Sequence, residues 1–181
     1  ILCRAVEKLI VKTYLWPSMN TELMQDQFAF KPTGSTTAAL LQIQHYVQTA
    51  FDQGNDYVRC LFIDYSKAFD TVSHPILLTE LTNLNLPPSI FLWISDFLSG
   101  RQQAVKVNNK ISKFVPINRS IVQGSVLGPY LYLVLVCKLK AKSDINKLFK
   151  YADDTTLLVP QHTDIDIFDE FHHLIEWSSE N

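Results

Sequence analysis

The chain has 181 residues, 47% of them apolar, enough for one or one and a half ordinary domains with a real hydrophobic core. No run approaches the roughly 20 apolar residues that cross a bilayer, the longest being 130–137, and no charged-then-apolar leader opens the sequence. The three cysteines are far apart and not grouped with histidines, so neither a disulfide framework nor a zinc site is indicated. We therefore expect an intracellular protein, nuclear or cytoplasmic, that is not secreted.

The formal net charge of −2 is unusual for a nucleic-acid-binding domain, but the charges are segregated along the chain. Residues 99–150 hold ten basic side chains and one acidic one, whereas residues 151–181 hold eight acidic side chains and no basic one. The basic residues of the middle segment could together line a phosphate-contacting surface, although any single one is better explained as a solvated side chain. They are Arg101, Lys106, Lys110, Lys113, Arg119, Lys138, Lys140, Lys142, Lys147 and Lys150.

The first third of the sequence predicts two helices and one strand. Apolar residues at helical spacing predict a helix over 2–15, which Pro17 would end. After a loop at 28–34, a serine is placed to cap a helix over 35–51. Residues 57–63 form a short apolar run rich in β-formers, which predicts a buried strand.

The rest of the sequence predicts four helices, a hairpin and two further strands. The helices are expected at 74–84, 87–98, 125–139 and 164–178, the hairpin at 102–117 across Asn108-Asn109, and the strands within 148–158. Strands separated by helices, with one hairpin, predict an α+β fold: a small, mostly antiparallel sheet covered by helices on one face.

Three aspartates stand where an unpaired charge is costly. Asp64 closes the first apolar strand, and Asp153 and Asp154 lie at the apex between the last two strands. If these strands are neighbours, the three carboxylates converge at one edge, where two Mg²⁺ ions would neutralise their repulsion. Such a pair of ions suits nucleotidyl transfer, although an Asp-Asp pair in a turn is by itself more often a cap or a solvated tip.

Four blocks in this order resemble the reverse transcriptases of non-LTR (LINE-type) retrotransposons. They are FAFKPTGSTTAAL at 28–40, LFIDYSKAFDTVSH at 61–74, QGSVLGP at 123–129 and KYADDTTLL at 150–158. The similarity covers nearly the whole chain, with matching spacings. It implies an RNA-directed DNA polymerase palm at 57–181 with part of the fingers at 1–56. We expect a fragment truncated at both ends, without the thumb.

The resemblance also implies the roles of the catalytic residues. Asp64 and Asp153 would be the principal ligands of two Mg²⁺ ions, with Mn²⁺ as an alternative metal. Asp154 would be a nearby acidic partner, and the backbone carbonyl of Tyr65 would complete the shell of one ion. The reaction would add a dNTP to a primer 3′-hydroxyl.

Further residues would contact the nucleotide if the resemblance holds. Phe69 stands where the family uses a bulky aromatic to exclude a ribose 2′-hydroxyl, and Gln123 and Gly124 would place a small backbone against the nucleotide. Lys31 stands where arginine is usual and would contact the triphosphate. From the residues alone, Phe69 is equally a core side chain, the Gln-Gly pair a helix start, and Lys31 a surface lysine.

The expected partners are an RNA template, a DNA primer and dNTP, with the thumb and endonuclease regions of the parent protein outside this chain. Several positions depart from the family pattern. Ser120 and Val122 stand where a glycine and a proline usually precede the Gln-Gly pair, and residues 137–139 replace a polar Asn-Asp element. The alternative is a catalytically inactive remnant or domesticated palm fold that binds nucleic acid or protein. A metal nuclease is disfavoured, because Phe69 and the Gln123 block would have no role in it.

Overall fold

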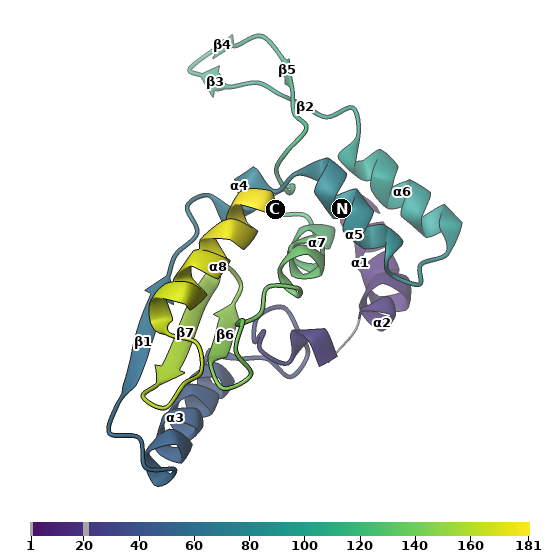
Figure 1. Cartoon of the computed structure of the whole chain (residues 1–181). Helices are drawn as coiled ribbons and strands as arrows, with labels where there is room; N and C mark the ends of the chain where they lie inside the picture. The colour runs from purple at the N-terminus through teal and green to yellow at the C-terminus, as the bar shows by residue number, and fades with distance from the viewer. Residues whose placement is uncertain (1, 20–21) are drawn as a thin grey trace. The chain divides into compact units, whose positions relative to one another are not determined.

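The computed structural model describes residues 2–19 and 22–181 (Figure 1). Two compact units make up the chain: a helical unit of Ile1–Met19 with Lys67–Val134, and a sheet unit of Asn20–Ser66 with Leu135–Asn181. Within the described ranges, no helix is both long and apolar enough to span a membrane. The mixed helix and sheet content confirms the α+β prediction.

The sheet unit is built on one antiparallel sheet of three strands in the order β1-β7-β6. The strands are β1 (Val58–Ile63), β6 (Lys147–Tyr151) and β7 (Asp154–Pro160). The helical elements of this unit are the 3₁₀ turn η2 (Glu22–Met24), α3 (Thr36–Asp52) and α8 (Ile167–Glu180). The expected cap of α3 is present, since the Ser35 hydroxyl accepts a hydrogen bond from Ala38 N at 3.0 Å.

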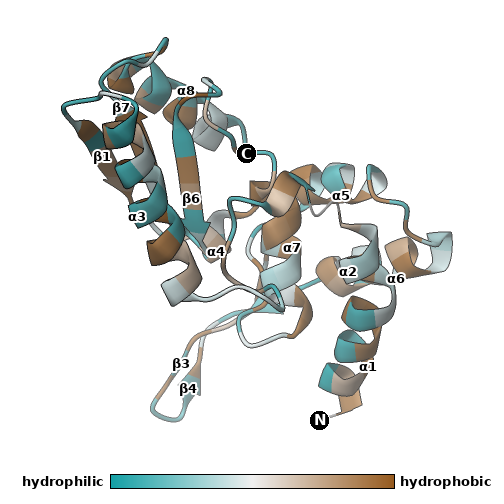
Figure 2. Cartoon of the chain, turned by 90° about the horizontal axis from the view of Figure 1, so that it is seen from below, coloured by the Kyte–Doolittle hydropathy of each residue, from teal (hydrophilic) through white to brown (hydrophobic). Residues whose placement is uncertain are grey.

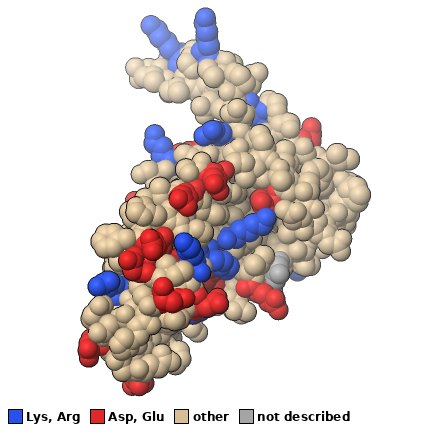
Figure 3. Space-filling view, in the orientation of Figure 1, with Lys and Arg blue, Asp and Glu red and all other residues tan. Residues whose placement is uncertain are grey.

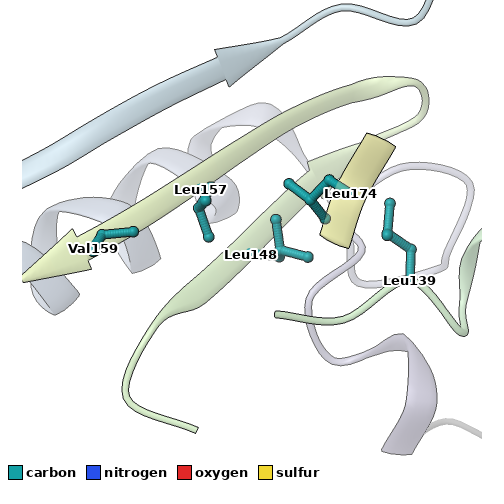
Figure 4. Packing of buried hydrophobic residues seen from close by; sticks show 5 residues of the cluster. All are labelled: Leu139, Leu148, Leu157, Val159 and Leu174. Carbon is teal, nitrogen blue, oxygen red and sulfur yellow. The ribbon is translucent and has the colours of Figure 1, made fainter. Parts of the chain in front are cut away.

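Helices lie on both faces of this sheet. Leu148 and Leu157 pack with Leu174 of α8, and Leu139 and Val159 complete this apolar cluster (Figure 4). The neighbouring Phe149 points to the opposite face, because successive side chains of a strand alternate. There its ring meets Tyr46 of α3, with the centroids 6.2 Å apart. The prediction of helices on one face only was therefore wrong.

The strand β1 is less buried than its apolar sequence predicts. Its residues are half-buried or exposed, and the Phe62 side chain is 77% exposed. The reason is its place in the sheet, because β1 is an edge strand that pairs with β7 alone. The prediction of a strand was confirmed, and the prediction that it is buried was wrong.

The helical unit contains most of the helices. They are α1 (Leu2–Ile10), the π-helix η1 (Val11–Leu15), α2 (Trp16–Ser18), α4 (Ala68–Thr71), α5 (His74–Thr82), α6 (Pro88–Leu98) and α7 (Leu127–Val136), whose last two residues belong to the sheet unit. Helix α7 is largely apolar, with brown turns interrupted by paler ones in Figure 2, and residues 131–136 are buried.

The first helical stretch does not stop at Pro17 as predicted. It continues through Ser18, after the wider turn of η1, and Met19 is the first extended residue. Proline is tolerated in the first turn of a helix, where its missing N–H would have no partner, and Pro17 lies at that position of α2.

The hairpin of the helical unit matches the prediction in place but is short. Its paired segments are β2 (Gln102–Gln103) with β5 (Val115–Pro116) and β3 (Lys106–Val107) with β4 (Lys110–Ile111). Asn108 has a positive φ of 52°, as its place in the turn requires. The side chains of both strand pairs are exposed, and Figure 3 shows basic side chains at this hairpin.

Candidate active site

The sheet brings the backbones of the three predicted aspartates to one end of the sheet unit. Ile63 of β1 pairs with Thr155 of β7 in the last pair of this ladder, so Asp64 follows β1 at the sheet end where β7 begins with Asp154. Asp153 lies beside them, in the two-residue turn between β6 and β7.

The donors at this sheet end fit a hard divalent cation in their chemistry. Mg²⁺ takes carboxylate and carbonyl oxygens together with water. Asp64 and Asp154 are exposed and Asp153 is half-buried, so all three carboxylates belong to the surface of the unit. Among residues 2–19 and 22–181, no three His, Cys, Asp or Glu side chains are gathered closely enough to hold a metal ion. The fold thus aligns the backbone positions without closing the side chains into a cluster.

Tyr65 directs its side chain away from the aspartates. Its ring packs against the apolar cluster under α8, because it continues the alternation of Leu61 and Ile63. Burial raises the pKa of its phenol, and the hydroxyl has no hydrogen-bond partner in the described part of the chain. What Tyr65 can offer to a ligand at the exposed sheet end is its backbone carbonyl.

Lys150, which precedes the aspartate turn, is an internal residue. Its side chain is 1% exposed, and its Nζ donates to the carbonyl oxygens of Val136 at 2.9 Å and Leu139 at 2.8 Å. The Oδ2 atom of Asp26 lies 3.2 Å away and also pairs with Lys140. Burial lowers the pKa of Lys150 to about 8. Lys150 therefore cannot belong to the basic surface that the charge pattern suggested.

Lys31 is held against its own loop. Its Nζ donates to the carbonyl oxygen of Met24 at 3.3 Å and lies 5.0 Å from the centroid of the Phe28 ring. Burial lowers its pKa, while the charge of Asp26 acts in the opposite direction. The loop depends on Gly34, since a β-carbon there would clash with the carbonyl of Phe28. Lys31 must leave this contact to reach a triphosphate.

In the helical unit, Phe69, Gln123 and Gly124 line one pocket of about 300 Å³. The Phe69 ring stacks on Tyr132, with the centroids 4.5 Å apart and the planes 26° apart. Gln123 donates from Nε2 to Asp70 Oδ1 at 3.1 Å, so Asp70 orients this side chain. The structure therefore groups the eight predicted site residues by unit: these three lie in the helical unit, and the aspartates, Tyr65 and Lys31 lie in the sheet unit.

Residues 1–179 match the family model described as "Reverse transcriptase (RNA-dependent DNA polymerase)". The chain belongs to the reverse transcriptase family. It is 30% identical over 165 residues to the RNA-directed DNA polymerase from mobile element jockey of Drosophila melanogaster, an alignment that covers 87% of this chain and 18% of that protein. It is 33% identical over 143 residues, 75% of this chain and 16% of the relative, to the probable RNA-directed DNA polymerase from transposon BS of the same species. These relatives confirm the predicted LINE-type retrotransposon origin.

Solved structures share the fold of this chain. The telomerase of Candida albicans, in complex with a TWJ fragment of telomeric RNA, superposes with a TM-score of 0.63 at 14% sequence identity. The superposition covers 97% of this chain and 32% of the telomerase chain. The telomerase of Candida tropicalis gives a TM-score of 0.60 at 11% identity. A palm-like polymerase fold is thereby established, and the chain spans less than a fifth of the length of the jockey and BS polymerases.

Two residues of this chain, Glu7 and Gln27, support the predicted blocks without having been predicted. Glu7 is buried, and its Oε2 accepts from Val126 N at 2.6 Å and Leu127 N at 3.1 Å, at the start of α7. Gln27 contacts the turn that carries Asp153. Glu7 and Gln27 gave no signal, because a polar residue in a helix or a connector is usually exposed.

The departure from the family pattern at Ser120 has a structural consequence. Its φ is +86°, a region that glycine enters freely and that other residues enter at a cost. The segment is nevertheless fixed, because Ser120 N donates to Val72 O at 2.9 Å and Ser120 O is 2.7 Å from His74 Nε2. A glycine at position 120 would adopt this φ without that cost.

Proposed function

We propose that this chain is the catalytic core of an RNA-directed DNA polymerase of a non-LTR retrotransposon, which adds dNTPs to a DNA primer on an RNA template. The observation that supports the proposal is the strand order and register, in which β1 ends at Ile63 beside Thr155, so that Asp64 follows at the sheet end with the turn of Asp153 and Asp154, in a chain of the reverse transcriptase family. Residues 57–181 would be the palm and residues 1–56 part of the fingers.

Asp64 and Asp153 would hold the metal ions through their carboxylates, with Asp154 as a third acidic group and the Tyr65 carbonyl as a further oxygen donor. Two Mg²⁺ ions, or Mn²⁺ in their place, would activate the primer 3′-hydroxyl and neutralise charge on the pyrophosphate leaving group. The edge position of β1 supports these roles, because a carboxylate at an open sheet end is accessible to a solvated ion and to phosphates.

Phe69 would exclude ribonucleotides by occupying the space of a ribose 2′-hydroxyl. Its stacking on Tyr132 supports this role, because a ring held on one face cannot easily rotate out of the way. Gln123 and Gly124 would form the wall against which the nucleotide lies, and the φ of +78° at Gly124 keeps that wall free of a side chain. Lys31 would bind the triphosphate as a point charge after leaving Met24.

The test is primer extension on an RNA template with Mg²⁺, performed with the full-length parent protein. Extension should vanish with Asp153→Ala, because the carboxylate that holds the ion is lost. The matched control is Asp52→Ala, which removes an exposed aspartate at the end of α3 and should leave extension unchanged. Undiminished extension with Asp153→Ala would refute the assignment of the site.

A second candidate is a catalytically inactive palm fold that binds nucleic acid or protein. The positive φ of Ser120 favours it, since a residue other than glycine adopts this conformation, just before the Gln-Gly pair, only at a cost in free energy. The same assay separates the two candidates. Wild-type protein that binds primer and template but extends no primer would support the inactive form.

A further inference from the structure

The turn that carries Asp153 is bound by the side chain of Gln27, 125 residues earlier in the chain. Gln27 is 1% exposed. Its Oε1 accepts a hydrogen bond from Ala152 N at 3.1 Å, and its Nε2 donates to Ala152 O at 3.3 Å. The amide of Gln27 therefore pairs with both polar backbone groups of the residue that precedes Asp153, as the peptide group of a neighbouring strand would.

Ala152 adopts a conformation that needs such support. The hairpin closes at the pair Tyr151 and Asp154, so the backbone groups of Ala152 lie outside the ladder of β6 and β7. Its φ is +58°, in the left-handed region that an L-residue enters only at a cost. Backbone outliers of this kind persist where the surroundings hold them in place.

Gln27 is itself fixed in position. Its Oε1 also accepts from Phe28 N at 3.1 Å and Ala29 N at 2.9 Å. The main chain around it lies alongside β6, because Lys150 N donates to Asp26 O at 2.7 Å and Phe28 N donates to Lys150 O at 2.8 Å. The Gln27 side chain is therefore held by its own loop as well as by the turn.

We propose that Gln27 is a positioning residue for Asp153. By fixing both backbone groups of Ala152, it sets the direction in which the chain leaves the turn and thus the direction of the Asp153 carboxylate. This inference rests on the proposed function, in which Asp153 binds the metal. Gln27 contacts neither the reacting atoms nor the substrate, so it acts only through Ala152. Partners of metal ligands are typically worth 10–100-fold in metal affinity or activity.

A purely structural role for Gln27 makes a different prediction. In that case the amide would serve only the N–H groups of its own loop, at Phe28 and Ala29. Its loss would then weaken the sheet unit as a whole, without a specific effect at the turn and without a change in metal dependence.

The test uses Gln27→Met in the full-length parent protein, because methionine matches the length of the side chain and lacks the amide. The matched control is Gln25→Met, two residues away at an exposed position. Hydrogen exchange is measured in metal-free protein, and residues 148–158 should exchange roughly 10-fold faster with Gln27→Met than with wild type or the control. The Mg²⁺ concentration for half-maximal primer extension should rise about 10–100-fold, with a smaller change in KM for dNTP.

A second substitution, at Ala152, tests whether the effect of Gln27→Met acts through the turn. Glycine accepts a positive φ without cost. Ala152→Gly in the Gln27→Met background should therefore lower the Mg²⁺ concentration for half-maximal primer extension part of the way back to the wild-type value. Gln27→Glu keeps an acceptor for Ala152 N and loses the donor to Ala152 O, and it should show an intermediate exchange rate. This variant also provides the exchange measurement if Gln27→Met does not fold.

The inference would be overturned if Gln27→Met showed the wild-type rate of hydrogen exchange at the turn and the wild-type Mg²⁺ concentration for half-maximal extension. So would faster exchange spread evenly over the sheet unit, or the absence of any rescue by Ala152→Gly. If wild-type protein shows no extension that depends on Asp153, the proposed function fails. The exchange data then still decide whether Gln27 holds the turn.

Discussion

The buried Lys150 makes the stability of the chain depend on pH in a defined direction. Its ammonium group lies among the carbonyls of Val136 and Leu139 and the carboxylate of Asp26, and burial lowers its pKa from 10.5 to about 8. Between about pH 8 and 10.5 the unfolded chain carries a proton on Lys150 that the folded chain has released. The unfolded state then binds more protons, so the free energy of unfolding rises with pH across this window.

The size of the effect follows from the shift in pKa. Each unit corresponds to about 1.4 kcal/mol, so the Lys150 contribution should add up to roughly 3 kcal/mol to the free energy of unfolding as pH rises through the window. Below pH 8 Lys150 is charged in both states, and its desolvation cost is present in full. Lys150→Met removes this titration and should flatten the pH dependence by the same amount.

The assay is urea unfolding of the chain and of Lys150→Met at intervals from pH 7 to pH 10. The other titrating groups are common to both proteins, so the difference between the two curves isolates Lys150. Lys147→Met is the matched control, because Lys147 is an exposed lysine of the same strand. Parallel curves for the wild type and Lys150→Met would refute the lowered pKa.

Two further changes test the helical unit. In the full-length polymerase, Phe69→Ala should raise the efficiency of ribonucleotide relative to deoxyribonucleotide incorporation by roughly 10-fold or more, the scale of discrimination by pocket shape. Phe97→Ala, which removes another stacked ring, is its control, and continued exclusion of ribonucleotides by Phe69→Ala would leave Phe69 as a packing residue only. Ser120→Gly should raise the free energy of unfolding by up to about 1 kcal/mol, because relief of the positive φ exceeds the entropy that glycine adds to the unfolded chain. A lower thermal midpoint with this substitution would contradict that account.

Local sequence signals were sufficient for most elements of the fold. The Ser35 cap, the two proline-led helices and the turn at Asn108 follow from interactions within a few residues, and each is present in the structure. Phe62 shows where such signals fail. An apolar strand indicates burial, but whether a strand is central or at an edge depends on partners that are distant in sequence.

The residues of the candidate site also divide into those that local sequence signals predict and those that they do not. The residue types and the order of the four blocks identify the reverse transcriptase family and the candidate catalytic aspartates, because these motifs are short and contiguous in the sequence. Burial of Lys150 and Gln27 could not be predicted, since a lysine or glutamine is exposed in most proteins. Both are buried because residues 26–28 lie beside β6, a contact between segments more than a hundred residues apart.

By itself, the amino-acid sequence determined the family of this protein, the positions of most helices and strands, and the identity of its candidate catalytic carboxylates. Only the tertiary structure decided that β7 lies between β1 and β6, which brings Asp64 to the sheet end with Asp153 and Asp154, and that Gln27 holds the turn before Asp153. The physical reason is that helix caps and turns are stabilised by neighbours along the chain. Strand register and the partners of buried polar groups depend on contacts that form only when distant segments pack together.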